Sequence, residues 1–158
     1  MIAVRRTLAR WELTVMQHLK LQFVVADGAR ARWVRRSAIA DDFVTSKETK
    51  AQRQSRGEPQ GVVFEGTSGR RFTVEERRGA VREHREAFAR EVADTLNAEA
   101  VAGEFERLAI VAPARTLNAI TQHLSAGASA KLVKTLAKDL SKTPDHALGA
   151  WLRPLELA

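Results

Sequence analysis

The chain has 158 residues, of which 44 % are hydrophobic and 28 % are charged, a composition typical of one globular domain. It contains no Cys, which excludes disulfide bonds, thiolate nucleophiles and Cys-ligated zinc or iron–sulfur sites. Lys and Arg number 26 against 19 Asp and Glu, and the resulting net charge of +7 favours a polyanionic partner.

The N-terminal residues begin like a signal peptide, but Arg10 and Glu12 interrupt the apolar stretch. No window approaches about 18 uncharged apolar residues. We therefore expect a cytoplasmic protein that is neither exported nor membrane-spanning. Residues 1–18 are predicted as an N-terminal extension, either the product of a misplaced start codon or a short amphipathic helix that packs on the domain. Residues 19–158 are predicted to form that single domain.

The first strands are predicted at residues 21–26 and 29–34, which flank Asp27 and Gly28. An Asp-Gly pair between two β-prone runs predicts a hairpin with the positive φ angles of a type I′ turn. In the second run, arginines alternate with small apolar residues and Trp33. One face of this strand is therefore expected to be apolar, and the other to present guanidinium groups.

Residues 37–60 contain several charged residues and few large apolar ones, which predicts a mobile loop. Residues 61–65 and 71–74 then flank a Gly-containing segment at 66–69. This arrangement predicts a second, shorter hairpin.

The main helix is predicted to begin at the capping box of residues 73–76. The residues that recur on one helical face, and are expected to face the core, are Val81, His84, Phe88, Val92 and Leu96. We interpret His84 as a core or boundary residue held by hydrogen bonds. The charged residues of the opposite face, Arg82 among them, are interpreted as a solvated surface.

A fully buried strand is predicted at residues 108–112, followed by a helix that opens at Pro113 and stops at Gly127. A strand that follows a helix implies a crossover and therefore some parallel pairing. Residues 131–140 fit a helical period better than strand alternation, so periodicity alone predicts a helix there.

The last helix is predicted from Thr143 as the N-cap and Pro144 in the first turn.

Three stretches resemble the bacterial host-attachment protein family in order and spacing: Val24-Val-Ala-Asp-Gly-Ala-Arg-Ala-Arg32, Leu108-Ala-Ile-Val-Ala-Pro-Ala-Arg-Thr-Leu117 and Leu136-Ala-Lys-Asp-Leu-Ser-Lys142. Weaker matches at residues 61–71 and 88–96 extend the coverage to about residues 20–152. This family is similar to the middle domain of archaeal and eukaryotic peptide-chain release factors. The resemblance implies an α/β fold of ribonuclease H-like layout, a mixed sheet of about five strands with helices packed on its faces. It also implies a strand at residues 131–137, against the periodicity.

The chain departs from that pattern at two points. It has no Gly-Gly-Gln, the sequence that the release-factor domain uses to hydrolyse peptidyl-tRNA, so the resemblance does not carry that chemistry over. A His of the family that follows the position of Arg71 is replaced by Phe72, which removes the imidazole there.

Basic residues are the main candidates for contacts with nucleic-acid phosphates, because the planar guanidinium group suits phosphate oxygens. These candidates are Arg30, Arg32, Arg35, Arg36, Arg71, Arg115, Lys138 and Lys142. The first four are expected to form a basic ridge after the first turn, and the alternative is a solvated strand face. Residues 113–116 could add backbone N–H groups at a helix start.

Four further residues are candidates for either a structural role or a site: Asp27, Gly28, Pro113 and Asp139. In a ribonuclease H-like layout, Asp27 and Asp139 could converge to bind magnesium. The alternative is that Asp27 stabilises its turn and Asp139 pairs with a neighbouring Lys. The four His residues are scattered and no cofactor motif occurs, so we expect neither a metal site nor a cofactor.

The sequence thus favours a non-catalytic binding module over an enzyme. Its expected partner is structured RNA, either tRNA or the ribosome, held through phosphate contacts. Two alternatives stay open, namely a metal-dependent phosphodiesterase and a protein-interaction domain that does not bind nucleic acid.

Overall fold

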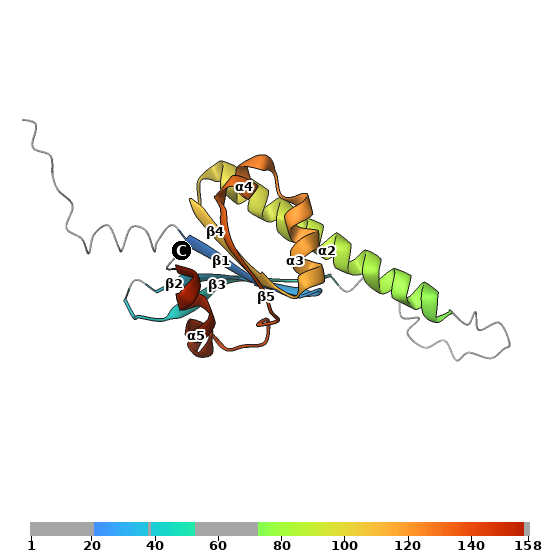
Figure 1. The fold of residues 1–158 in the computed structure, drawn as a ribbon, viewed down its shortest axis with the longest axis horizontal. Coiled ribbons are helices and arrows are strands. Elements are labelled where there is room, and N and C mark those ends of the chain that lie inside the picture. Colours follow the sequence, from blue (N-terminus) through green and yellow to red (C-terminus); the bar gives the residue numbers. More distant parts are fainter. Residues whose placement is uncertain (1–20, 38, 53–72, 157–158) are drawn as a thin grey trace, which may run out of the picture.

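A computed structural model describes residues 21–37, 39–52 and 73–156. The described residues form five strands and four helices (Figure 1). The elements are β1 (Leu21–Ala26), β2 (Arg30–Arg36), β3 (Phe43–Lys50), α2 (Val74–Ala102), β4 (Arg107–Ala112), α3 (Ala114–His123), α4 (Ala126–Lys131), β5 (Leu132–Ala137) and α5 (Asp145–Glu156). The predicted N-terminal extension, Arg71 and nearly all of the second hairpin lie outside the described residues. The hairpin's last residues, Thr73 and Val74, instead begin α2.

The strands form one mixed sheet in the order β3-β2-β1-β4-β5. β1 pairs antiparallel with β2, as the predicted hairpin requires, and β2 pairs antiparallel with β3. β4 pairs parallel with both β1 and β5. The α/β fold with a five-stranded mixed sheet is therefore confirmed.

β5 is a strand where periodicity alone predicted a helix. Its pairing with β4 contains a bulge, since Leu108 and Ala109 are neighbours whereas their partners Leu132 and Lys134 are two residues apart. The bulge moves the following side chains to the other face. Leu132 accordingly packs on one side of the sheet and Leu136 on the other, a spacing that imitates a helical period.

Helices cover both faces of the sheet and create two cores. Val24 and Ala26 face α2, α3 and α4, whereas Phe23 and Val25 face α5 (Figure 1). Side chains alternate between the faces of a strand, so every residue of the central strand β1 is buried. This double coverage explains why β1 and β4 consist almost entirely of apolar residues.

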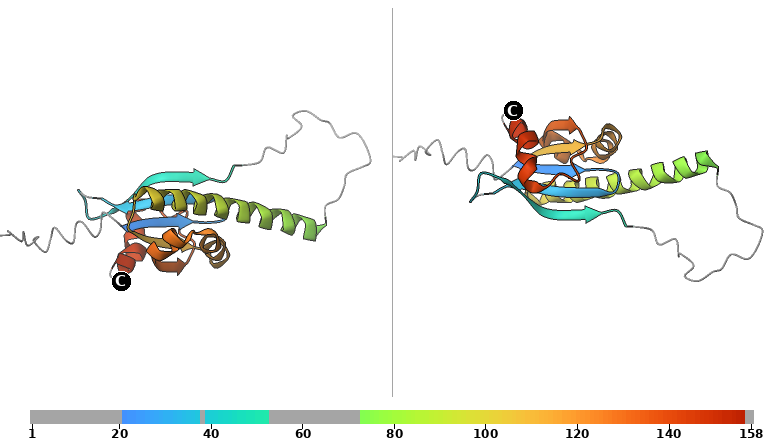
Figure 2. Two further views of the ribbon diagram at one scale, coloured as in Figure 1. Left: turned by 90° about the horizontal axis from the view of Figure 1, so that it is seen from above. Right: turned by 90° about the horizontal axis from the view of Figure 1, so that it is seen from below.

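α2 begins at the predicted capping box, because the Thr73 hydroxyl accepts from the Glu76 N–H while the Glu76 carboxylate accepts from the Thr73 N–H. The first buried residue of the helix is Phe88. The turns before Phe88 project beyond the sheet (Figure 2). Val81 is therefore 49 % exposed and His84 is also exposed. Our placement of these two residues in or at the core is wrong, since this part of the helix lines open cavities instead of packing on the sheet.

β3 lies within the segment predicted as a mobile loop, and that prediction is wrong for Phe43–Lys50. Most side chains of β3 are exposed to solvent, and its polar composition resembles that of a loop. Its backbone, however, pairs with β2 along its whole length. An edge strand can be held by such backbone pairing with few apolar side chains.

Two helix boundaries also differ from the prediction. α3 ends at His123 rather than at Gly127, because the Ser125 hydroxyl accepts from the Ala128 N–H and starts a new helix, α4, that contains Gly127. α5 begins at Asp145, one residue later than predicted. Of the described helices, none is long and apolar enough to cross a membrane.

Candidate functional site

The parallel strands β1, β4 and β5 end at the same edge of the sheet, which is where open α/β sheets bind ligands. A pocket of about 1200 Å³ lies at this edge, and the exposed half of α2 contributes to its wall. We call it the strand-end pocket. The candidate site residues from the sequence that line it are Asp27, Gly28, Arg30, Pro113, Arg115, Asp139 and Lys142. The fold thus brings together residues from the ends of all three strands.

The turn after β1 is held by the Asp27 carboxylate, whose Oδ1 accepts from the N–H groups of Ala29 and Arg30, both at 2.7 Å. The predicted type I′ turn is wrong, because Gly103 is the one described Gly with a positive φ angle. In this turn the Arg30 N–H donates to the Asp27 side chain, whereas in a type I′ turn it would donate to a backbone carbonyl. Gly28 allows a close approach of the Arg85 side chain, which would have to shift if residue 28 had a Cβ, since that atom would lie 2.9 Å from Cγ of Arg85.

Ser141 lies between two of the carboxylates of the strand-end pocket: its hydroxyl donates to Asp139 Oδ1 at 2.7 Å, and it also interacts with Asp27. Burial of Asp27 raises the pKa of its carboxyl. Hydrogen bonds from Ser141 and from the N–H groups of Ala29 and Arg30, together with the charge of Arg30, outweigh burial, so this pKa lies below its ordinary range. Asp27 is therefore ionised at neutral pH. In the part of the chain that is described, no three His, Asp or Glu residues are grouped to hold a metal ion.

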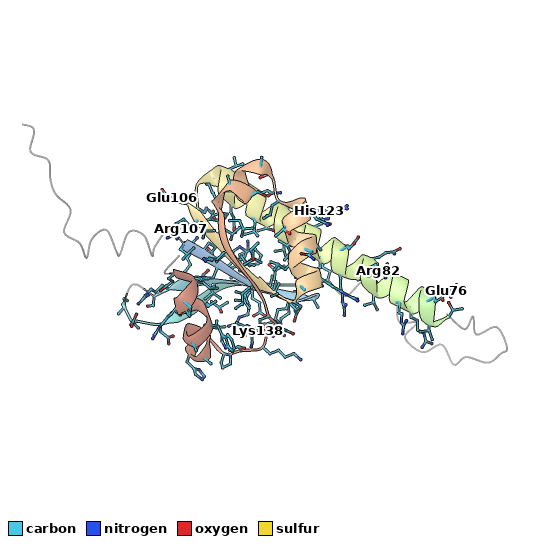
Figure 3. All side chains as sticks on the ribbon, viewed as in Figure 1. Glu76, Arg82, Glu106, Arg107, His123 and Lys138 are labelled. Carbon is cyan, nitrogen blue, oxygen red and sulfur yellow. The ribbon has the colours of Figure 1, made fainter. Side chains whose placement is uncertain are left out.

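A second cavity of about 800 Å³ lies between the projecting half of α2 and one side of α3, from Arg115 to Gln122. We call it the α2–α3 groove. The charged residues that line it are Arg77, Arg78, Arg82, Arg85 and Arg115, with Glu86. Arg82 can be seen on the projecting turns of α2 (Figure 3). Val81, Arg85, Arg115 and Thr116 line both cavities, which makes the groove continuous with the strand-end pocket.

The arginines of α2 in this groove were missed by the sequence reasoning, which assigned Arg82 to a solvated surface. Arg78 and Arg85 precede the buried Val92 at heptad spacing and therefore lie on its side of the helix. The face that packs on the sheet becomes basic where the helix passes the sheet edge. The signal in the sequence is this replacement of apolar residues by Arg along one face.

The predicted basic ridge is not a free surface. Arg32 is 7 % exposed, and its guanidinium group donates to the carbonyl oxygens of Ser141 and Thr143 and to the Asp145 carboxylate. The strand face expected to present guanidinium groups is covered by α5 and the residues before it. The prediction that Arg32 is available to a phosphate is therefore wrong.

The other predicted basic residues outside the strand-end pocket also have partners. Arg35 donates to Gln22 Oε1 at 2.7 Å, and Arg36 forms ion pairs with Asp41 and Glu156. Both arginines lie at the far end of β2, because β2 runs antiparallel to β1. Lys138 stacks on the Trp151 ring, with Nζ 3.6 Å from its centroid.

The family model for proteins required for attachment to host cells matches residues 22–152. No curated protein matches the chain. Among solved structures, the archaeal translation termination factor aRF1 is 11 % identical with a TM-score of 0.49, over 84 % of this chain and 33 % of that one. A structure titled only as an archaeal protein is 13 % identical with a TM-score of 0.45, over 92 % of this chain and 37 % of that one.

The chain thus spans about a third of the length of these two structures. At such identities the similarity concerns the fold alone and does not bear on what this chain binds. The family match is of another kind, because it extends from β1 into α5 and includes every described element between them. The chain belongs to the family of proteins required for attachment to host cells.

Proposed function

We propose that this protein is a non-catalytic binding module that holds structured RNA, either tRNA or ribosomal RNA, through backbone phosphates in the α2–α3 groove. One observation carries the proposal. Five arginines line this groove, and none of them forms an ion pair within the described part of the chain. Clustered cations that lack acidic partners repel each other, and a polyanion relieves that repulsion.

The basic residues that serve the fold provide the contrast. Arg32 and Arg36 contact carboxylates directly, and Lys47 is paired with Glu99. In the α2–α3 groove the guanidinium groups are left for an external anion, and their planar forks match phosphate oxygens. α2 holds several of them on one helix whose N-terminal half extends beyond the sheet (Figure 2).

The same surface favours contact with phosphates over contact with bases. The chain has no Tyr, Trp33 is buried in the core, and no aromatic side chain is among the described residues that line the groove, so these residues offer no platform on which bases could stack. Phosphate contacts position a protein on a nucleic acid without reading its sequence. We therefore infer recognition of RNA shape.

The test is the salt dependence of RNA affinity, measured with purified tRNA and with an RNA hairpin of scrambled sequence. Log affinity should fall linearly with log salt concentration, because each phosphate contact releases counterions. Arg82→Gln should weaken binding of both RNAs similarly and flatten the slope by about 0.7 to 0.9. Arg90→Gln is the matched control, since Arg90 is exposed on α2 but outside both cavities, and should leave the slope unchanged.

Two outcomes would contradict the proposal. One is the lack of measurable RNA binding by the native chain at about 50 mM salt, where surface electrostatics is only weakly screened. The other is an equal effect of Arg82→Gln and Arg90→Gln, which would mean that net charge alone controls binding. In either case a protein-interaction domain becomes the better description.

A metal-dependent phosphodiesterase is the second candidate, favoured by the presence of Asp27 and Asp139 in one pocket. The residues fit a metal site poorly. Oδ1 of each carboxylate already accepts two hydrogen bonds, and no third ligand is grouped with them in the described residues. We expect no cleavage of RNA or of a model phosphodiester with magnesium or manganese. Cleavage that both Asp27→Asn and Asp139→Asn abolish would establish this second candidate instead.

A further inference from the structure

We propose that the first turn of α3, residues 114–116, binds a single phosphate group at the junction of the strand-end pocket and the α2–α3 groove. The inference deepens the RNA-binding proposal by naming the group held at this point. The phosphate can belong to an internal phosphodiester of RNA or to a terminal phosphomonoester of an RNA or a free nucleotide. Both sources present the same oxygens to the protein.

The backbone of this turn supplies three free donors. Leu117 is the first residue of α3 whose N–H bonds within the helix, to the Pro113 carbonyl at 2.9 Å. The N–H groups of Ala114, Arg115 and Thr116 have no acceptor among the described residues, and the N-cap residue Pro113 offers no side-chain acceptor. Free N–H groups and the positive end of the helix dipole together favour an anion.

The Thr116 hydroxyl is an independent indication of a ligand. Thr116 is 7 % exposed, yet its side chain lines both cavities. Its hydroxyl has no hydrogen-bond partner in the described part of the chain. Thr116 Oγ1 is not among the buried side-chain atoms without a partner, so the hydroxyl is accessible from the cavities while the rest of the residue is packed. A phosphate oxygen on the first turn of α3 would give it an acceptor.

The charges around this turn restrict the anion to the junction. Arg85 and Arg115 line both cavities and lie beside the turn. The remainder of the strand-end pocket carries three carboxylates, of Asp27, Glu91 and Asp139, beside three cations, Arg30, Lys50 and Lys142. Its charges therefore balance, and Arg30 and Lys50 also lie within 4 Å of Glu48, whereas Arg85 and Arg115 have no acidic partner among the described residues. The excess of positive charge thus lies at the junction, beside the first turn of α3.

The test uses inorganic phosphate, a nucleoside 5′-monophosphate, and an RNA hairpin with and without a 5′-phosphate. Thr116→Val removes the hydroxyl. Ala114→Pro removes one N–H at the first helical position, where Pro is tolerated, and the extended backbone of Pro113, with ψ of 147°, suits a following Pro. Each variant should weaken binding roughly tenfold, as expected for a hydrogen bond to a charged group. Thr121→Val, on α3 but outside both cavities, should have no effect.

Thermal unfolding of each variant checks that the fold is intact, and Thr116→Val alone suffices if Ala114→Pro does not fold.

The binding results then distinguish the two sources of the phosphate. Affinity for the monophosphate that depends on Thr116 assigns a terminal phosphate. If Thr116→Val weakens the affinity for RNA but not for the monophosphate, and does so whether or not the RNA carries a 5′-phosphate, the bound group is an internal phosphodiester. RNA binding that needs Arg82 but not Thr116 overturns this inference and leaves the RNA proposal standing. Phosphate binding that needs Thr116, without any RNA binding, supports the phosphate site and contradicts the RNA-binding proposal. Unchanged affinity of both variants for every ligand also overturns the inference of a phosphate site.

Discussion

Replacing Trp33 with Ala is expected to destabilise the protein by about 3 to 5 kcal/mol, as for other large-to-small substitutions of buried aromatic residues. Trp33 is 2 % exposed and lies in the core between the sheet and α2. Its indole Nε1 donates to Glu99 Oε2 at 2.9 Å, and Lys47 Nζ lies 4.7 Å from the ring centroid. The substitution therefore removes both the packing of β2 against α2 and a hydrogen bond between them.

Denaturant unfolding measures this loss, and in a domain of this size it should lower the melting temperature by about 10 °C. Trp151→Ala is the matched control, because Trp151 is 39 % exposed on α5 and contributes mainly its contact with Lys138. That variant should lose about 1 kcal/mol. Equal losses for the two variants would show that Trp33 does not anchor the core. The folded fraction of Trp33→Ala should keep the salt slope of the native chain for RNA.

Replacing Arg32 with Met is expected to cost about 3 kcal/mol, because it leaves buried acceptors without donors. The guanidinium group binds the carbonyl oxygens of Ser141 and Thr143, the Thr45 hydroxyl and the Asp145 carboxylate. It thereby connects β2, β3 and the segment that leads into α5. Asp145 is 38 % exposed, so solvent screens this ion pair, and most of the loss should come from the buried carbonyls.

The same variant should change how stability depends on pH. Burial raises the pKa of the Asp145 carboxyl, but hydrogen bonds from Thr45 and Arg32, with the charge of Arg32, outweigh it and hold this pKa below its ordinary range. A carboxyl with a lowered folded-state pKa stabilises the fold above its unfolded pKa, and this contribution is lost as the pH falls through the folded value. The native chain should therefore lose stability below about pH 4, and Arg32→Met should lose less over that range.

Arg90→Met is the control for this comparison, since Arg90 is exposed and a surface substitution is usually within about 0.5 kcal/mol of neutral. Urea unfolding of the three proteins at pH 7 and at acid pH provides the measurement. An Arg32→Met protein as stable as the native chain would show that the buried network is not needed for folding. A flattened salt slope for RNA in this variant would instead return Arg32 to the phosphate-binding residues.

The sequence predicted those elements whose signal is local. The hairpin of β1 and β2, the buried strand β4 and the capping box at Thr73 each depend on neighbouring residues, and each is confirmed. β5 is different, because its bulge against β4 hides the strand alternation. That strand was predicted only through the family resemblance.

Only part of the candidate site could be predicted, because here too local signals are readable in the sequence and long-range contacts are not. Residues that directly follow the strands, such as Asp27 and Asp139, could be placed at one edge once the strands were known. The burial of Arg32 could not be predicted, because its partner Asp145 is 113 residues away in the sequence. The arginines of α2 were missed because their exposure depends on how far the helix passes the sheet edge, a mismatch of lengths that no local pattern records.

In the proposed function, RNA phosphates bind the projecting half of α2, so the order of this half-helix and ligand binding would form one coupled equilibrium. Between Val74 and Phe88 the helix has no buried residue, and at 1.5 Å per residue this stretch is about 20 Å long. Gly79 lies within it and lowers its helical stability by about 0.5 to 1 kcal/mol relative to Ala. The stretch can therefore unwind while the rest of the domain stays folded, as weakly packed helix ends do. An anion that needs several of these arginines in register selects the wound form, so the capping box at Thr73 controls how much of the binding free energy is spent on ordering the helix.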